Sequence, residues 1–208
     1  NIIFYLNNDE LFTFPIALFL FKKINSKYSI YLKLSDTSLR KKIKIILILF
    51  LRGELKNLLK YYNKKISLEK LLSLKNVNQI KKDKYKKFEF GISINYPKKI
   101  IDLKNKIYNF HYGNFTHQRG SFIFFYKDLY NWSHVDLTFH QINSKLDSGK
   151  ILNNHSVKVK NMKTLELIAL PLKNKAFFWK SFKKINKKRK IIKKSKGPIN
   201  KEPSFLDI

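Results

Sequence analysis

Apolar residues recur along the chain with two different periods, and each period predicts a different kind of element. Apolar runs, or runs that alternate, are typical of strands, and apolar residues three and four apart are typical of helices. The predicted strands are residues 2–6, 28–34, 88–95, 107–112 and 135–142, with a further one at 156–159. The predicted helices are residues 10–24, one or two helices within 39–62, residues 67–73, and a helix that starts at Thr164 and is kinked or divided at Pro171. A strand, a helix and a strand with short turns form a right-handed βαβ unit, so the pattern predicts an α/β fold.

The strand at 107–112 brings two polar side chains together. Period two sends Asn109 and His111 to the same face, with their roots about 7 Å apart. The strand stops before Gly113, so the pair lies at a carboxyl end, which is where ligands bind in an open parallel sheet. An amide and an imidazole in that position are candidates for catalysis.

A carboxylate follows the strand at 135–142. A turn at residues 145–149 places Asp147 at another strand end, before the apolar pattern resumes at Ile151. A carboxylate near an imidazole raises the pKa of the imidazole and keeps it protonated. Asp147 is therefore the candidate partner of His111.

These residues, in this order, resemble the signature of a known enzyme family. The matching positions are Asn109-Phe110-His111, Gly113, Arg119-Gly120, Leu137-Thr138-Phe139-His140 and Leu146-Asp147-Ser148-Gly149-Lys150-Ile151-Leu152. The pattern is similar to that of the 10-formyltetrahydrofolate-dependent N-formyltransferases, which include the glycinamide ribonucleotide, methionyl-tRNA and nucleotide-sugar formyltransferases. One departure is Phe115-Thr116, where that family commonly has Leu-Pro.

The resemblance implies both a fold and an activity. The fold is a Rossmann-like, open and mostly parallel sheet flanked by helices, with a catalytic domain at residues 1–160 and a C-terminal helix with a lysine-rich tail at 161–208. The activity is transfer of a formyl group from 10-formyltetrahydrofolate to a primary amine, without a metal. Asn109, His111 and Asp147 are the implied catalytic residues, since a tetrahedral oxyanion needs donors and the amine's proton needs a route.

Other site residues are assigned by their positions in the resemblance. The implied neighbours of the folate are Ile94, Asn95, Tyr96, Ile100 and Leu146; for Ile94 and Ile100 a place in the core is the alternative. Arg119 and Gly120 are implied to bind the acceptor, with a surface ion pair as the alternative for Arg119. Structural rather than catalytic roles are expected for His117, His134 and His140. The first strand lacks a following G-x-G-x-x-G motif, which argues against dinucleotide binding.

The charge of the chain limits the classes of partner. A net charge of +30 favours nucleic acid or an anionic membrane as a partner. Only four of the 44 basic residues are arginines, however, and arginine is the residue preferred for bidentate phosphate recognition. Compositional drift is therefore the preferred explanation of the charge. The chain has no cysteine, which excludes disulfides, thiolate nucleophiles and cysteine metal sites.

Two further segments have distinctive compositions, one apolar and one rich in lysine. Residues 43–51 are apolar but too few to cross a bilayer, which takes about 20 residues. A buried helix is the preferred interpretation of them, and a helix lying on anionic lipid is the alternative. The lysine-rich run at 183–196 is typical of a solvated helix or tail.

The leading functional hypothesis is formyl transfer to a small or nucleotide-linked amine such as an amino sugar. One alternative is methionyl-tRNA formylation, with tRNA as partner. Another is a noncatalytic basic protein that binds RNA or a membrane on a formyltransferase-like scaffold, and the intact Asn109, His111 and Asp147 argue against it. A need for reduced folate implies a cytoplasmic location.

Overall fold

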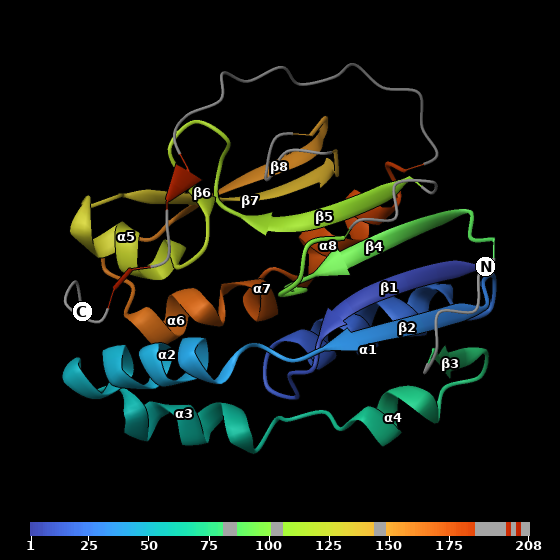
Figure 1. The fold of residues 1–208 in the computed structure, drawn as a ribbon, viewed down its shortest axis with the longest axis horizontal. Helices are drawn as coiled ribbons and strands as arrows, with labels where there is room; N and C mark the ends of the chain where they lie inside the picture. Colours follow the sequence, from blue (N-terminus) through green and yellow to red (C-terminus); the bar gives the residue numbers. More distant parts are fainter. Residues whose placement is uncertain (81–86, 101–105, 144–148, 186–198, 201–202, 205–208) are drawn as a thin grey trace.

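A seven-stranded mixed sheet organises the fold (Figure 1). The computed structural model describes residues 1–80, 87–100, 106–143, 149–185, 199–200 and 203–204. The strands, in their order across the sheet, are β3 (Val77–Gln79), β2 (Ile30–Ser35), β1 (Ile2–Asn7), β4 (Phe90–Ile94), β5 (Ile107–Tyr112), β7 (His134–Gln141) and β8 (Ile151–Lys158). Neighbours from β3 to β5 are parallel, whereas β7 is antiparallel to β5 and β8 is antiparallel to β7. The prediction of an α/β fold with a mostly parallel sheet is confirmed.

The order of the strands marks where a ligand can bind. The chain runs outward from β1 through β2 to β3 and then returns to place β4 on the other side of β1. In open α/β sheets, the crevice at such a switch point, beside the carboxyl ends of the strands, is the usual ligand site. The loops after β1, β4 and β5 all leave the sheet at this edge, because these strands are parallel.

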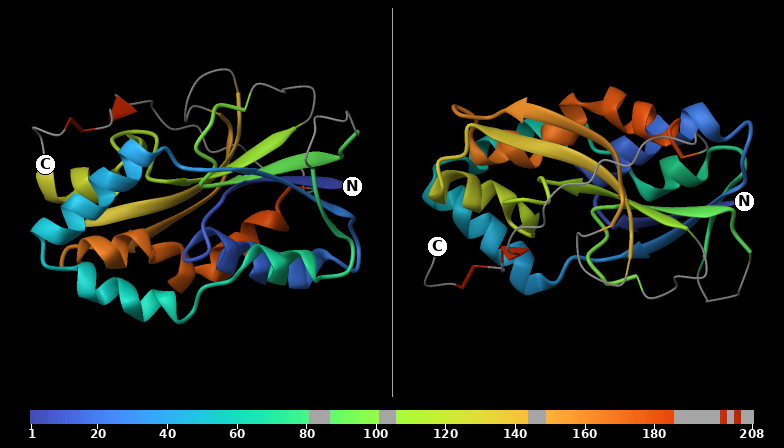
Figure 2. Two further views of the ribbon diagram at one scale, coloured as in Figure 1. Left: turned by 60° about the horizontal axis from the view of Figure 1, so that its bottom comes forward. Right: turned by 90° about the horizontal axis from the view of Figure 1, so that it is seen from above.

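Most helices surround one face of the sheet or extend from its ligand-binding edge (Figures 1 and 2). They are α1 (Thr13–Ile24), α2 (Leu39–Leu51), α3 (Leu55–Tyr62), α4 (Leu68–Leu72), α5 (Ile123–Leu129), α6 (Thr164–Ile168), α7 (Leu170–Lys173) and α8 (Lys175–Phe182). A separate pair of short strands, β6 (Arg119–Gly120) and β9 (Ile199–Asn200), joins the segment between β5 and α5 to the C-terminal segment.

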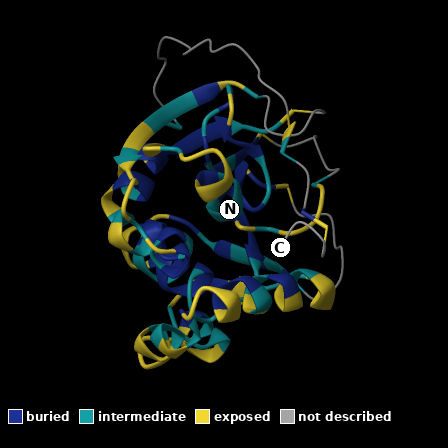
Figure 3. Cartoon of the chain, turned by 90° about the vertical axis from the view of Figure 1, so that its left-hand side faces the viewer, coloured by how far each residue is buried: buried dark blue, intermediate teal, exposed yellow. Residues whose placement is uncertain are grey.

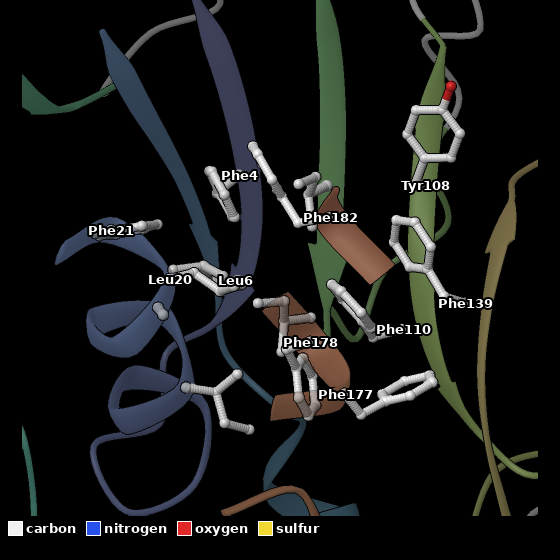
Figure 4. Close-up of a cluster of buried hydrophobic side chains, with 14 of the residues drawn as sticks. Phe4, Leu6, Leu20, Phe21, Tyr108, Phe110, Phe139, Phe177, Phe178 and Phe182 are labelled. Carbon is white, nitrogen blue, oxygen red and sulfur yellow. The ribbon is translucent and has the colours of Figure 1, made fainter. Parts of the chain in front are cut away.

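The main core lies between the sheet and the helices α1 and α8. Phe4 of β1 meets Phe21 of α1 edge to face, with ring centroids 4.8 Å apart, and Phe110 of β5 contacts Phe178 of α8 at 4.5 Å (Figure 4). A smaller cluster, which includes Ile3 and Ile107, covers the opposite face. Alternate residues of β1 and β5 therefore divide between the two faces, as period two requires.

The predicted elements are present, most with small shifts at their ends; the last predicted strand, 156–159, is only the end of the longer β8. The first helix starts at Thr13 rather than at residue 10, although the Asp9 carboxylate accepts the N–H groups of Leu11 and Phe12 at 3.0 and 3.2 Å. Residues 39–62 form two helices, α2 and α3, and the break at Pro171 separates α6 from α7. The prediction missed β3, β6, β9, α5 and α8.

The preferred interpretation of residues 43–51 as a buried helix is wrong for half of that helix. Ile48 and Leu49 of α2 are buried, but Ile43 is 47% exposed and Phe50 is 64% exposed. Burial depends on what the fold places against each face, and the apolar composition of α2 does not indicate a partner on its outer side.

The C-terminal helix α8 packs into the same hydrophobic core as the strands and helices that precede it. Phe177, Phe178 and Phe182 of α8 belong to the same cluster as Phe4 and Phe110. The lysine-rich run at 186–196 lies outside the described residues. No described helix is both long and apolar enough to cross a bilayer.

Candidate functional site

A cleft of about 1510 Å³ opens at the carboxyl edge of the sheet. Its walls come from the loop after β1, the first half of α2, the exit of β4, and the strands β5 and β7. Residues 120–124, together with Ile199 and Asn200 of β9, form another wall. The volume exceeds the roughly 300 to 1,000 Å³ that is usual for a site holding one small ligand.

Asn109 and His140 face each other across β5 and β7. They are register partners, and the Asn109 Nδ2 atom lies 3.2 Å from His140 Nε2. The other ring nitrogen of His140, Nδ1, lies 3.1 Å from the main-chain oxygen of Gln141. Because that oxygen only accepts, Nδ1 carries the hydrogen in the neutral ring, and Nε2 then accepts from the Asn109 amide. This arrangement fixes which end of the amide is NH2, and both side chains line the cleft.

His111 is held by the loop that follows it. Its Nε2 lies 2.8 Å from the main-chain oxygen of Gln118, and its side chain is buried. Since a carbonyl accepts only, Nε2 carries a hydrogen whether the ring is neutral or protonated.

Gln118 fixes the shape of that loop, although no motif or periodicity in the sequence singled it out. Its Oε1 accepts the N–H groups of Asn114 and Asp136, both at 3.1 Å, and its Nε2 donates to the His134 oxygen at 2.8 Å. The side chain is buried. Gln118 therefore joins the loop after β5 to the start of β7.

Two glycines of the motif lie where the backbone passes too close for a side chain. Gly113 has φ +120°, and a Cβ there would lie 2.0 Å from the Gln118 oxygen. A Cβ on Gly149 would lie 1.5 Å from the oxygen of Gln141 at the end of β7. The glycines at these motif positions thus follow from close approach of two segments.

The residues implied to neighbour the folate are not all at the cleft. Asn95, Tyr96 and Ile100 line it, together with Asn109 and His111. Ile94 is instead buried in the main core. Asn95 has φ +53°, and its Nδ2 donates to Thr13 Oγ1 at 3.3 Å, which ties the exit of β4 to the start of α1.

The two residues implied to bind the acceptor are on β6. Gly120 lines the cleft, whereas Arg119 is buried, so a surface ion pair is wrong for it. A Cβ on Gly120 would lie 2.2 Å from the Asn200 oxygen of β9. Leu146 and Asp147 lie outside the described residues.

Besides the histidines, the cleft is lined by acidic and basic side chains: Asp9, Glu10, Asp36, Lys41, Lys42, Lys98 and Lys99. Burial raises the pKa of the Asp9 carboxyl above its usual value of 3.8, against the lowering effect of its hydrogen bonds to backbone N–H groups. His117 and His134 are exposed and are not part of the cleft wall. Among the described residues, no three His, Asp or Glu side chains are grouped to hold a metal ion.

The chain resembles known proteins in its structure rather than in its sequence. No family model matches the chain, and no curated protein is a match in sequence. The sugar 3N-formyltransferase WlaRD superposes with a TM-score of 0.63 at 18% identity, over 93% of this chain and 65% of that protein.

Two further structures extend the likeness. A 4-N formyltransferase from Francisella tularensis has a TM-score of 0.61 at 20% identity, over 99% of this chain and 77% of its own. The methionyl-tRNA formyltransferase of Clostridium thermocellum has a TM-score of 0.53 at 10% identity, over 97% and 73%. This chain therefore has the fold of the formyltransferase family.

Proposed function

We propose that this protein transfers a formyl group from 10-formyltetrahydrofolate to a primary amine. The observation that carries the proposal is the pairing of Asn109 with His140 in the cleft, beside His111 on the same strand. The amide is oriented before any ligand arrives, and it lies at the edge of the sheet where an α/β fold binds ligands.

Asn109 is suited to stabilise the negative charge that forms on the formyl oxygen. One hydrogen of its amide points to His140, so a second hydrogen is available on the same nitrogen. An oriented donor of this kind lowers the barrier because it need not reorganise during the reaction. His140 thereby acts as a positioning residue.

His111 is suited to move the proton that the attacking amine must lose. Its Nε2 hydrogen is held by Gln118, which fixes the orientation of the ring in the cleft. The amine forms a bond to the formyl carbon, the bond from that carbon to the folate nitrogen breaks, and this nitrogen takes up a proton. Asp147, assigned from the sequence motif, is proposed to relay the proton onward from His111.

We further propose a small or nucleotide-linked amine, such as an amino sugar, as acceptor. One of the compared structures, WlaRD, is a sugar 3N-formyltransferase, and its structure was obtained with dTDP and 5-N-formyl-THF. A cleft larger than is usual for one small ligand is consistent with this choice. Methionyl-tRNA is the second candidate, because a methionyl-tRNA formyltransferase shares the fold.

The test measures turnover with amino-sugar nucleotides and with aminoacyl-tRNA, each with 10-formyltetrahydrofolate. Asn109→Ala should lower kcat by about two to three orders of magnitude, which corresponds to about 2.7 to 4 kcal/mol, while folate binding and the far-UV spectrum are retained. Asn161→Ala, at an exposed position outside the cleft, is the matched control and should leave kcat unchanged. Equal turnover of Asn109→Ala and the parent protein would show that the amide has no part in the chemistry.

A further inference from the structure

The outer surface of α2 and α3 is apolar, although it faces away from the core. In Figure 3 these two helices, at the lower edge, are mostly exposed or intermediate, and in Figure 2 they lie on the outside of one end of the molecule. Seven large apolar side chains are exposed on this helical pair: Leu39, Ile43, Ile46, Phe50, Leu51, Leu59 and Tyr62. They are most of the exposed large apolar side chains found in the described part of the chain.

The exposed residues of α2 form one continuous stripe. Leu39, Ile43, Ile46 and Phe50 are four, three and four positions apart, which places them on one face of a helix. The opposite face of α2 is held against the rest of the protein, because Ile48 and Lys44 on that face are buried. The Nζ of Lys44 donates to the main-chain oxygen of Pro203. Since the inner face is already occupied, α2 cannot rotate to bury its stripe.

The ionised groups that α2 and α3 themselves expose are cationic, and two of these cations are ion-paired with neighbouring carboxylates: Arg52 with Asp128 and Lys65 with Glu10. Between Leu39 and residue 65, the basic residues are Arg40, Lys41, Lys42, Lys44, Arg52, Lys56, Lys60, Lys64 and Lys65. Glu54 is the one acidic residue in this part of the sequence. It is buried, and its carboxylate accepts the N–H groups of Thr164 and Leu165 at 3.0 and 2.8 Å. The exposed side chains of the pair are thus apolar or cationic, apart from neutral polar groups.

We propose that the outer face of α2 and α3 docks on an anionic lipid surface. An apolar helical face with lysines and arginines beside it buries its side chains among acyl chains while the cations meet lipid phosphates. A second copy of this chain is a poorer occupant, because each copy has a net charge of +30 and the two surfaces repel. Docking of this kind is peripheral and requires no helix that crosses the bilayer.

This docking surface can be changed without changing the cleft. Ile46 lines the cleft, but Ile43 and Phe50 are absent from its described wall. Leu49 is buried, so a charge there would unfold the protein. The double variant Ile43→Asp/Phe50→Asp therefore removes the apolar anchor and leaves the proposed catalytic residues intact. Failure of the formyl-transfer proposal would not affect its result.

The experiment is flotation of the whole protein with vesicles of phosphatidylcholine alone and of phosphatidylcholine mixed with phosphatidylserine, at an ionic strength of about 0.15 M to limit nonspecific adhesion. The parent protein should float with the anionic vesicles, and Ile43→Asp/Phe50→Asp should lower its partition constant by about ten to a hundredfold. Ser26→Asp/Asn161→Asp makes the same change of charge at exposed positions elsewhere and should lower it far less. Phe50→Trp should show a blue-shifted emission on binding, as expected for an indole that enters the lipid interface.

Four results would overturn the proposal. Equal partitioning of the two double variants would show that binding is general attraction of lysines to anions. An unshifted emission of Phe50→Trp on bound protein would place the stripe away from lipid. Absence of flotation, or a dimer in analytical ultracentrifugation that Ile43→Asp/Phe50→Asp dissociates, would assign the stripe to another occupant.

Discussion

The Gln118 side chain provides a direct test of how the site loop is held. Gln118→Leu keeps nearly the same volume and removes the side-chain hydrogen bonds to Asn114, Asp136 and His134. The Asp136 N–H is buried and would have no acceptor from this side chain, which costs about 1 to 3 kcal/mol. The other two groups are nearer to solvent and regain water, so each adds about 0.5 to 1 kcal/mol. The sum predicts a loss of about 2 to 5 kcal/mol in the free energy of unfolding.

Urea denaturation followed by circular dichroism measures this loss, with the m-value as a check that the denatured state is unchanged. Gln118→Glu keeps an acceptor for the Asn114 and Asp136 N–H groups and should be less destabilised than Gln118→Leu at neutral pH if the acceptor is the main contribution. Gln141→Leu makes the same chemical change at a half-buried position of β7 and should cost less than 1 kcal/mol, about the effect of an ordinary surface change. If Gln118→Leu unfolded at the same urea concentration as the parent, the loop would not depend on this side chain.

Two further predictions concern the backbone and the pH dependence of the site. Gly113→Ala should destabilise the fold by at least about 3 kcal/mol, since φ is +120° and the added Cβ would lie 2.0 Å from the Gln118 oxygen. Thermal unfolding measures this loss of stability. The control is Gly53→Ala, at φ +65° with open space around it, which should cost only about 1 to 2 kcal/mol. Equal losses in both variants would mean that the close approach is unimportant. The raised pKa of Asp9 makes the folded state bind its proton more tightly, so the stability that this group contributes is present below its usual pKa and is lost as pH rises through the folded pKa. The stability of the parent relative to Asp9→Asn should therefore fall in urea titrations as the pH rises from below 3.8 through the raised pKa of the folded state, and a constant or rising difference would contradict burial as the cause.

The antiparallel direction of β7 has a consequence for catalysis. Because β7 runs against β5, His140 near the end of β7 lies opposite Asn109 rather than beyond the strand end. A parallel β7 would pair these strands in another register and would take His140 away from the amide. The expectation that His140 has a structural role agrees with its hydrogen bonds, but the structure adds that its partner is the proposed oxyanion donor.

The periodicity of the sequence was sufficient for the local elements and for the shared face of Asn109 and His111. Strand alternation depends only on neighbouring residues, so residues 107–112 predict that face without knowledge of the rest of the chain. The switch in strand order, by contrast, joins residues far apart in sequence. The α/β class followed from the pattern of strands and helices, and the family fold followed from the resemblance in the motif.

Short strands and paired surfaces were decided only by tertiary structure. The strands β6 and β9 have two residues each, too few to show a period, and they exist because Gly120 allows close approach of Asn200. The hydrogen bonds of Gln118 join three segments, so no local pattern indicates them.

The sequence by itself determined that α2 is an apolar helix and that Asn109 and His111 share a face, since both follow from backbone geometry over a few residues. Only the tertiary structure decided which side of α2 is covered, that Ile94 belongs to the core, and that His140 orients Asn109. The physical reason is that burial and side-chain hydrogen bonds depend on segments brought together from distant parts of the chain.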